Sequence, residues 1–423
     1  MAIRADFVIV HAEELVTLGG GKGGPRTKGG LRDLGLVEDG AVAVKDGRIV
    51  AVGRTDEVLG NIEGRFESID ATGRLVSPGL IDPHVHLVFA GSREQELEDM
   101  AVKNTPYLEI KARGGGMPTT LKKTAETPTE ELVRNTTRTL DAMLVHGTTT
   151  IEAKSGYEMS FEGELRQLEI IRTLGESHPI GIVPTFLAQG IPFGYEDRVD
   201  QLTDEIVRVW IPEIAKRGLA VYCDVFCEKG YFSVAQSRRI LEAGRASGMK
   251  PRIHADWLGH SGGAKLGSEL NVVSADHLIF TPRQEVEKLV ENGSMGTFLP
   301  TTPFCYLGTY ANAREIIGMG LPIALGTDLS AADMCESMQM MMAIAILQMK
   351  MTSAEALTAA TLNAAHSIGR GGEIGSLEVG KKADIVMFDA PNHQFFAYHY
   401  GVNLAEKVFK NGKLVAERGR RVT

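Results

Sequence analysis

The stretch SPGLIDPHVH, residues 77–86, decides the fold. It contains a short, nearly continuous apolar run that is typical of a strand buried on both faces, and this run ends in His84 and His86. Because side chains alternate along a strand, both imidazoles lie on one face and can reach one metal ion. The stretch therefore predicts a buried strand with metal-binding residues at its end.

Seven further stretches of this kind follow, separated by amphipathic helical stretches such as residues 127–147. Strands that are buried on both faces and separated by helices indicate parallel βαβ units, and eight such units close into a (β/α)8 barrel of the TIM type. The predicted strands lie in residues 80–86, 148–154, 180–186, 220–226, 250–256, 271–277, 295–300 and 321–328.

Both ends of the chain have the pattern of short strands instead. The dipeptides Asp46-Gly47 and Asn411-Gly412 predict two-residue hairpin turns. The glycine-rich stretch 19–30 is expected to be a flexible surface loop. We expect an α/β protein in which residues 1–76 and 373–423 build a small β-sandwich domain beside a barrel of residues 77–372.

The composition is that of an ordinary globular protein. The chain has 423 residues, of which 43% are hydrophobic and 23% charged, so wholesale disorder is excluded. Its net charge is -9 and its basic residues are scattered, which predicts no nucleic-acid partner. No apolar run approaches the ~18 residues of a membrane span, and the first residues lack a signal-peptide pattern. We expect a cytoplasmic protein without a membrane partner.

Polar residues follow several of the other predicted strands. His254 ends the fifth strand, His277 ends the sixth and Asp328 ends the eighth. In a TIM barrel the carboxyl ends of the strands carry the active site, so these residues should meet His84 and His86 there. Three imidazoles and one carboxylate suit a divalent metal that keeps an open position for water.

Several long motifs carry a resemblance. The stretch at residues 77–86 with the distant GTD, together with HLVFAGSREQE, EAKSGYEM, DVFCEKGYFS, SADHL and YHYGVN, resembles the amidohydrolase superfamily and, within it, the imidazolonepropionases. These motifs span nearly the whole chain. The resemblance implies a homodimer and one zinc or iron ion, which His84, His86, His254 and Asp328 would hold.

The resemblance also implies roles around the metal. Asp328 would accept a proton from water and return it to the leaving nitrogen, and His277 would steady the developing oxyanion. Arg93 would grip the carboxylate of a small-molecule substrate, as a bidentate guanidinium can. Tyr157, and less specifically Tyr107, would be further pocket contacts.

Three pocket positions depart from the family pattern. Gln189 stands in TFLAQG where the family has a histidine, and Ser330 stands in TDLSAA where the family has an asparagine. Trp257 replaces a glutamate or glutamine after HAD. An indole cannot accept a hydrogen bond from a polar ring but offers a flat apolar face.

These departures favour a changed substrate. The main expectation is an enzyme that breaks, or by dehydration closes, a cyclic C–N bond on a planar and aromatic carboxylate, such as an aminobenzoate-derived or benzoxazole-type compound. The alternative is the plain family reaction, hydrolysis of 4-imidazolone-5-propanoate to N-formimino-L-glutamate in histidine degradation. A non-catalytic scaffold is a minor alternative, because no expected metal ligand is missing.

Overall fold

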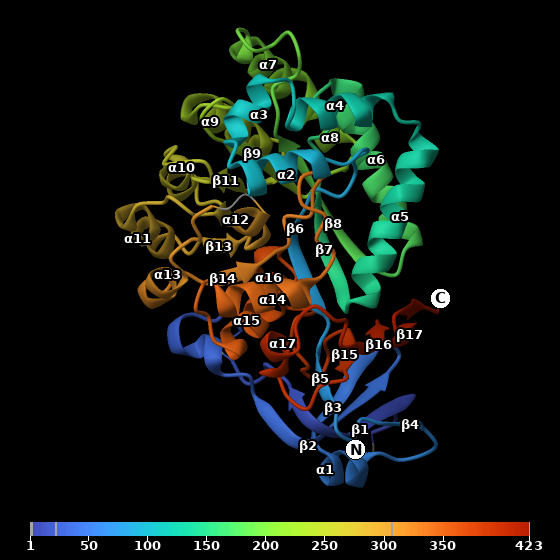
Figure 1. Ribbon diagram of the computed structural model, residues 1–423. Helices are drawn as coiled ribbons and strands as arrows, with labels where there is room; N and C mark the ends of the chain where they lie inside the picture. Colours follow the sequence, from blue (N-terminus) through green and yellow to red (C-terminus); the bar gives the residue numbers. More distant parts are fainter. Residues whose placement is uncertain (1–2, 22, 306–307, 423) are drawn as a thin grey trace.

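The computed structural model describes residues 3–21, 23–305 and 308–422. A parallel sheet of eight principal strands forms the upper part of the molecule in Figure 1, and each strand overlaps one of the eight predicted stretches. The prediction of a (β/α)8 barrel is confirmed. Its strands are β6 (Leu80–Val85), β7 (Thr148–Lys154), β8 (Gly181–Ala188), β9 (Tyr222–Cys227), β11 (Ile253–Ala255), β12 (Ser274–His277), β13 (Met295–Phe298) and β14 (Ile323–Leu325), with the short β10 (Lys250–Pro251) beside β9.

The barrel closes between its first and last strands. Val85 and Leu329 form a parallel bridge just beyond β14. The amide of Asp328 donates to the carbonyl of His84 over 3.2 Å, and the amide of His86 donates to the carbonyl of Leu329 over 2.9 Å. Backbone hydrogen bonds at the point of closure therefore hold His84 and His86 against Asp328.

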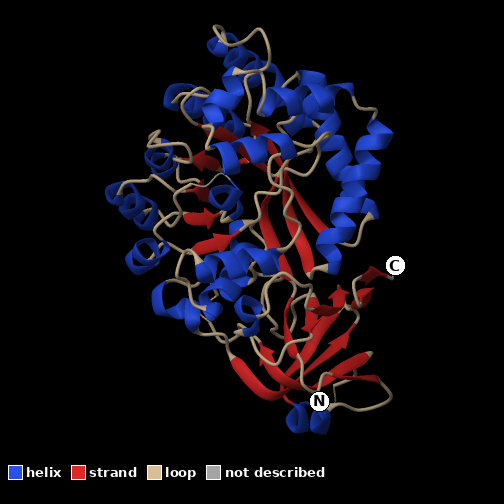
Figure 2. Ribbon diagram, in the orientation of Figure 1, coloured by secondary structure: helices blue, strands red, loops and turns tan. Residues whose placement is uncertain are grey.

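Helices surround the barrel, as Figure 2 shows. Between β6 and β7 the chain makes a long excursion through α2 (Glu94–Lys103), α3 (Tyr107–Ala112), α4 (Met117–Glu126) and α5 (Thr129–Val145). The other helices after the barrel strands are α6 (Phe161–Ser177), α7 (Val199–Glu205), the π-helical η2 (Ile206–Trp210), α8 (Ile211–Lys216), α9 (Val234–Ala246), α10 (Gly263–Glu269), α11 (Arg283–Glu291), α12 (Thr301–Cys305), α13 (Ala313–Met319), α14 (Met338–Leu347), α15 (Ser353–Ala359) and α16 (Leu362–Ser367).

The two ends of the chain form a second sheet, at the bottom of Figure 1. Both predicted hairpins are present, and their turn residues Asp46, Gly47, Asn411 and Gly412 have the positive φ that such turns require. The elements here are β1 (Phe7–Val16), η1 (Lys28–Arg32), β2 (Leu36–Lys45), β3 (Arg48–Arg54), α1 (Thr55–Asn61), β4 (Glu67–Asp70), β5 (Leu75–Pro78), β15 (Ile385–Phe388), α17 (Phe395–Tyr398), β16 (Ala405–Lys410), β17 (Lys413–Glu417) and β18 (Arg420–Arg421).

The expected sandwich takes the form of one strongly curved sheet. Phe7 on β1 and Phe409 on β16 are separated in the sheet by β5 and β15, so a flat sheet would hold them roughly 14 Å apart. Their ring centroids lie only 5.3 Å apart. The sheet therefore folds over itself, and the buried side chains on its concave face pack as the two layers of a sandwich would.

The glycine-rich stretch 19–30 is not wholly a surface loop. Arg26 within it is buried, and its amide donates to Oδ1 of Asn363 over 2.8 Å. Residue 22 lies outside the described residues. Within the described ranges, no helix is both long enough and apolar enough to cross a membrane.

Candidate active site

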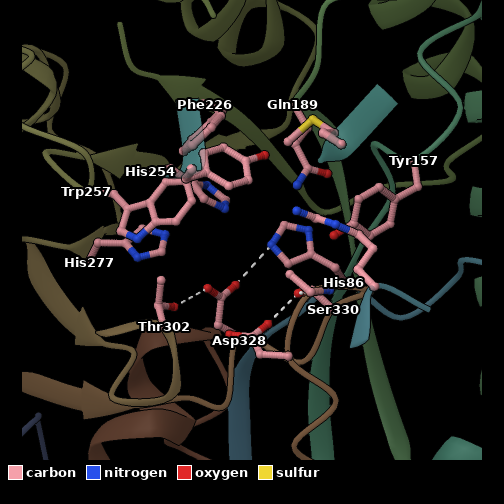
Figure 3. A pocket seen from close by; sticks show the side chains of 15 residues that line it. His86, Tyr157, Gln189, Phe226, His254, Trp257, His277, Thr302, Asp328 and Ser330 are labelled. Atoms are coloured by element: carbon pink, nitrogen blue, oxygen red, sulfur yellow. Dashed lines mark hydrogen bonds and ion pairs between the residues drawn. The ribbon is translucent and has the colours of Figure 1, made fainter. Parts of the chain in front are cut away.

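Five predicted residues converge at the carboxyl ends of the barrel strands, as Figure 3 shows for most of them. β6 supplies His84 and is followed by His86, β11 supplies His254, β12 ends in His277, and Asp328 follows β14. None of the five is more than 8% exposed. Strands distant in sequence thus deliver four imidazoles and a carboxylate to one buried point, where a TIM barrel places its active site.

The ligand atoms are spaced for a metal ion. Those of His84, His86 and His254 lie within 4.8 Å of one another, and so do those of His84, His277 and Asp328. Oδ1 of Asp328 lies 3.2 Å from Nε2 of His86 and 3.4 Å from Nε2 of His84. Nε2 of His84 and Nε2 of His254 are buried and make no hydrogen bond. Buried imidazole nitrogens of this kind beside a carboxylate fit a divalent metal.

The backbone is unusual at two of these residues. His277 has a φ of 78° and Asp328 a φ of 54°. Positive φ is uncommon outside glycine, and such conformations persist where the surrounding structure holds them, often at functional sites. Here they turn the two side chains toward the common point at the strand ends.

Two aspartates orient two of the imidazoles. Nδ1 of His84 lies 2.7 Å from Oδ2 of Asp276, and Nδ1 of His254 lies 3.2 Å from Oδ1 of Asp224. A carboxylate on Nδ1 fixes the tautomer that leaves Nε2 available as a ligand, and it makes that nitrogen more basic.

A buried charge network supports these aspartates. Nζ of Lys154 lies 2.8 Å from Asp224, 3.0 Å from Glu152 and 4.0 Å from Asp276. Arg252 Nη2 lies 3.1 Å from Oδ2 of Asp276. All of these side chains are fully buried, so each charge depends on its partners.

The protonation states of His86, His277 and Asp328 suit metal binding. Burial tends to lower the pKa of His84, but the carboxylates of Asp276 and Asp328 outweigh burial and raise it. Burial lowers the pKa of His277 to about 3 and that of His86 to about 4, so both rings are neutral at neutral pH. Burial tends to raise the pKa of Asp328, but its contacts with His84 and His86 outweigh burial and hold it well below its usual range. Thr302 also donates to Oδ2 of Asp328 over 2.5 Å. A neutral imidazole and an ionised carboxylate are the ligand forms that a metal requires.

All six predicted substrate contacts line one pocket with these residues. The pocket is the one drawn in Figure 3. Tyr157 is tilted against His86, with ring centroids 5.6 Å apart. Gln189 and Ser330 are both buried. The structure thus brings these positions together with the candidate metal ligands; they are Arg93, Tyr107, Tyr157, Gln189, Trp257 and Ser330.

Trp257 turns toward the pocket. Its indole stacks on His277 with centroids 5.8 Å apart and planes inclined by 29°, and it packs on Phe226 at 5.6 Å. The carboxylate of Glu228 accepts hydrogen bonds from the amides of Trp257, over 2.6 Å, and Leu258, over 3.4 Å. A buried glutamate therefore fixes the backbone that places the indole.

Arg93 contacts an acid as well as lining the pocket. Its Nε lies 2.7 Å from Oε2 of Glu96, and its side chain is 5% exposed. The other oxygen of Glu96 accepts the amide of Gly116 over 2.8 Å. Arg93 is therefore held in the buried pocket wall rather than in a surface ion pair.

Sequence reasoning missed the supporting residues. Glu152 and Lys154 lie two residues apart on β7, and Asp224 lies within the apolar strand β9. Charged residues inside strands that are predicted to be buried are unusual, and this was the signal that could have identified them. Thr302 and Asp333 offered no comparable signal, because they lie outside the strands.

Comparison with known proteins agrees with this geometry. Residues 234–415 match the Amidohydrolase family, a range that includes His254, His277 and Asp328. A relative named imidazolonepropionase from Alkaliphilus metalliredigens is 46% identical over 423 residues, which cover 99% of this chain and 100% of the relative. Another of the same name, from Geobacillus kaustophilus, is 46% identical over 97% of this chain and 98% of its own length.

The chain belongs to the amidohydrolase family. Within that family it is imidazolonepropionase-like, and it is an enzyme of the hydrolase class.

Solved structures of other enzymes share the fold. An adenosine deaminase from Xanthomonas campestris with bound zinc has a TM-score of 0.72 and 20% sequence identity, and the match covers 100% of this chain and 95% of that one. Atrazine chlorohydrolase from Arthrobacter aurescens, complexed with zinc, has a TM-score of 0.71 and 16% identity, over 98% of this chain and 96% of that one.

Proposed function

We propose that this enzyme hydrolyses 4-imidazolone-5-propanoate to N-formimino-L-glutamate. The observation that carries the proposal is the candidate metal site lying in one pocket with Arg93, in a chain that matches relatives named imidazolonepropionase over nearly its full length. We propose ring opening rather than ring closure, because the names of these relatives describe a hydrolase of this substrate and not a cyclase.

We propose that the site holds one Zn²⁺ or iron ion. His84, His86, His254 and Asp328 would be its ligands. This is supported by the buried Nε2 atoms of His84 and His254, which make no hydrogen bond, and by the zinc in solved structures of the same fold. Such a metal, when bound, would supply a water of lowered pKa and would polarise the ring carbonyl.

The residues of the chain would perform the proton transfers. Asp328 accepts the proton of the attacking water as oxygen bonds to the ring carbonyl carbon. Neutral His277 donates an N–H to the oxyanion that develops there. As the C–N bond breaks, Asp328 returns the proton to the departing ring nitrogen, and Arg93 holds the propanoate group in place.

A second candidate substrate class is favoured by Trp257. Its indole offers a flat aromatic face beside His277, on which a planar carboxylate such as an aminobenzoate derivative can stack. This candidate ranks below imidazolonepropanoate because no relative named above carries such an activity.

The deciding experiment compares turnover of imidazolonepropanoate with turnover and binding of planar aromatic acids by the metal-loaded enzyme. We expect kcat/KM for imidazolonepropanoate of about 10⁴ M⁻¹s⁻¹ or more. Turnover at background level, together with efficient reaction of a benzoxazole-type or aminobenzoate-derived acid, would overturn the proposal in favour of the second candidate.

A further inference from the structure

The helix α3 lies over the pocket with little buried surface. Among its residues, Tyr107–Ala112, Ile110 alone is buried, and Leu108 is exposed. Tyr107, at its start, lines the pocket, and its ring packs on Trp257 with centroids 5.7 Å apart. Because buried apolar surface is the main force that holds a helix in place, α3 can move away at a low cost in free energy.

Two side chains attach α3 to the loop after β9. Nζ of Lys111 donates to the carbonyl of Gly230 over 3.1 Å and lies 3.9 Å from the centroid of the Tyr231 ring. The hydroxyl groups of Tyr107 and Tyr231 lie 3.3 Å apart. Because α3 belongs to the excursion after β6, and β7 and β8 separate β6 from β9 in the sheet, α3 reaches across the strand ends that carry the pocket.

The backbone on both sides of α3 is suited to a hinge. Asn104, just after α2, has a φ of 54°, and Gly114 has a φ of 88°. Gly116 has a φ of 73° and a ψ of -150°, a region almost confined to glycine. Hinges are a few positions at the ends of elements that absorb changes in φ and ψ. These residues therefore allow α3 to turn as a unit about its two ends.

One carboxylate joins Arg93 to the hinge after α3. Oε2 of Glu96 accepts from Nε of Arg93 over 2.7 Å, and Oε1 accepts from the amide of Gly116 over 2.8 Å. With Nε held in this way, Nη1 and Nη2 form the edge of the guanidinium that a ligand carboxylate would meet. The ring of Tyr107 lies 5.7 Å from Cζ of Arg93. The direction of the guanidinium therefore depends on α3 and its hinge.

A carboxylate on Arg93 would bind this closed arrangement better than an open one. When α3 swings away, the amide of Gly116 leaves Glu96 and the ring of Tyr107 leaves Arg93, so the guanidinium loses its orientation and meets water. An ion pair is stronger when it is well oriented and shielded from water. A ligand shifts a conformational equilibrium only by its difference in affinity for the two states. A carboxylate supplies that difference, and a neutral group does not.

We propose that α3 is a lid over the pocket and that Glu96 is a positioning residue, which couples closure of this lid to a ligand carboxylate on Arg93. The inference rests on the proposed function, in that Arg93 is taken to hold the carboxylate. It adds a conformational step in which the lid closes on acids and stays mobile with neutral analogues. The closed pocket, from which water is excluded, is thereby reserved for ligands with a negative group.

Hydrogen–deuterium exchange of the metal-loaded enzyme tests the proposal with two probes of similar shape that the enzyme cannot hydrolyse. Phenylpropanoate carries a carboxylate, and benzylacetone carries a neutral methyl ketone in its place. At saturating concentration we expect the acid to slow exchange of the amides of residues 104–116 by about fivefold or more. The ketone should slow it by less than about twofold.

Variants of Glu96 test the coupling. In Glu96→Gln the side chain has one acceptor oxygen for two donors, so the effect of the acid should fall below about twofold. Glu96→Asp keeps the charge but shortens the reach, and it serves if the glutamine variant does not fold; the same loss is expected, and full protection contradicts the proposal. Glu98→Gln, at an exposed residue of the same helix, should match the wild type.

Three results would overturn the inference. If benzylacetone protects residues 104–116 as well as the acid does, closure does not depend on the carboxylate. If Glu96→Gln keeps the full effect of the acid, Glu96 does not couple the two. If neither probe changes the exchange of this segment in the wild type, α3 is a fixed wall of the pocket.

Arg93→Met separates this inference from the proposed function. By calorimetry, the wild type should bind the acid about tenfold or more tightly than the ketone, and Arg93→Met should lose that preference. A preference that persists would contradict the role of Arg93 in the proposed function, and with it the coupling. If the preference is lost and one of the three results above is found, the inference fails while the proposed function stands.

Discussion

The ammonium group of Lys154 lies 2.8 Å from Oδ2 of Asp224, and neither side chain is exposed. Oδ1 of the same carboxylate accepts from Nδ1 of His254, so one aspartate joins a buried cation to a candidate metal ligand. Burial lowers the pKa of Lys154, but Asp224 and Glu152 outweigh burial and raise it above its usual value. The lysine is therefore charged, and it balances the carboxylates that orient the histidines.

Replacing Lys154 by methionine should weaken metal binding without touching a ligand. The change leaves Asp224 as a buried charge short of a partner, which costs about 3–5 kcal/mol of folding stability. Metal affinity should fall about 10- to 100-fold, as measured by competition with a chelator. Lys122→Met is the matched control, because that side chain is 76% exposed. Unchanged metal affinity in Lys154→Met would show that the network has no part in holding the site.

His254→Ala should remove metal and activity together. Its imidazole is one of four expected ligands, and its loss opens the site. Elemental analysis should find about one zinc or iron per wild-type chain and much less in the variant. His260→Ala is the control, because His260 is half exposed and pairs with Glu285 instead. A His254→Ala protein with full metal and full turnover would exclude His254 as a ligand.

Stability should depend on pH through Glu228. Burial raises its pKa from 4.5 to about 7, so the folded protein keeps a proton that the unfolded chain releases. Its contribution to stability is therefore fully present below about pH 4.5 and is lost as pH rises to about 7. The difference in unfolding free energy between wild type and Glu228→Gln should fall by up to about 3 kcal/mol from pH 5 to pH 8.

Denaturant titrations at several pH values measure this difference. Glu176→Gln, at an exposed residue, should show no such trend. If the difference in unfolding free energy between wild type and Glu228→Gln does not change between pH 5 and pH 8, Glu228 titrates as an exposed glutamate does.

The barrel, and the meeting of the candidate metal ligands at one end of it, could be predicted because both follow from local pattern. Apolar runs mark strands buried on both faces, and polar residues at their ends must gather at one rim of a closed barrel. His84, His86, His254, His277 and Asp328 were found in this way. The turns at Asp46-Gly47 and Asn411-Gly412 were equally local, since the left-handed backbone of each turn selects its residues.

Long-range contacts could not be predicted from the sequence pattern. Arg26 lies in a stretch with the composition of a flexible loop, yet it bonds Asn363, 337 residues away. The contact of Asp333 with Ser330, and its place beside Arg93, depend on how a loop without periodic pattern folds. The single curved sheet likewise depends on which strands pair, and a pattern of short strands does not determine that.

We expect the substrate range to depend most on Trp257. Its indole packs on His277, Phe226 and Tyr107, with centroid distances between 5.6 and 5.8 Å. Trp257→Leu should weaken binding of phenylpropanoate about three- to tenfold, because an aromatic pair contributes about 0.5–1.5 kcal/mol beyond buried area. Butanoate, which lacks a ring, should bind both proteins alike. Tyr398→Leu, at a side chain 82% exposed, is the control for loss of an aromatic residue elsewhere.

The variant Trp257→Glu tests whether the residue at this position also affects the reaction. A carboxylate at this place can accept hydrogen bonds from a polar ring, which an indole cannot. We expect this variant to raise kcat/KM for imidazolonepropanoate and to lower affinity for phenylpropanoate, with the two effects measured in parallel assays. If both quantities match the wild type, the indole contributes only packing between Phe226 and His277, and the pocket discriminates among substrates by other residues.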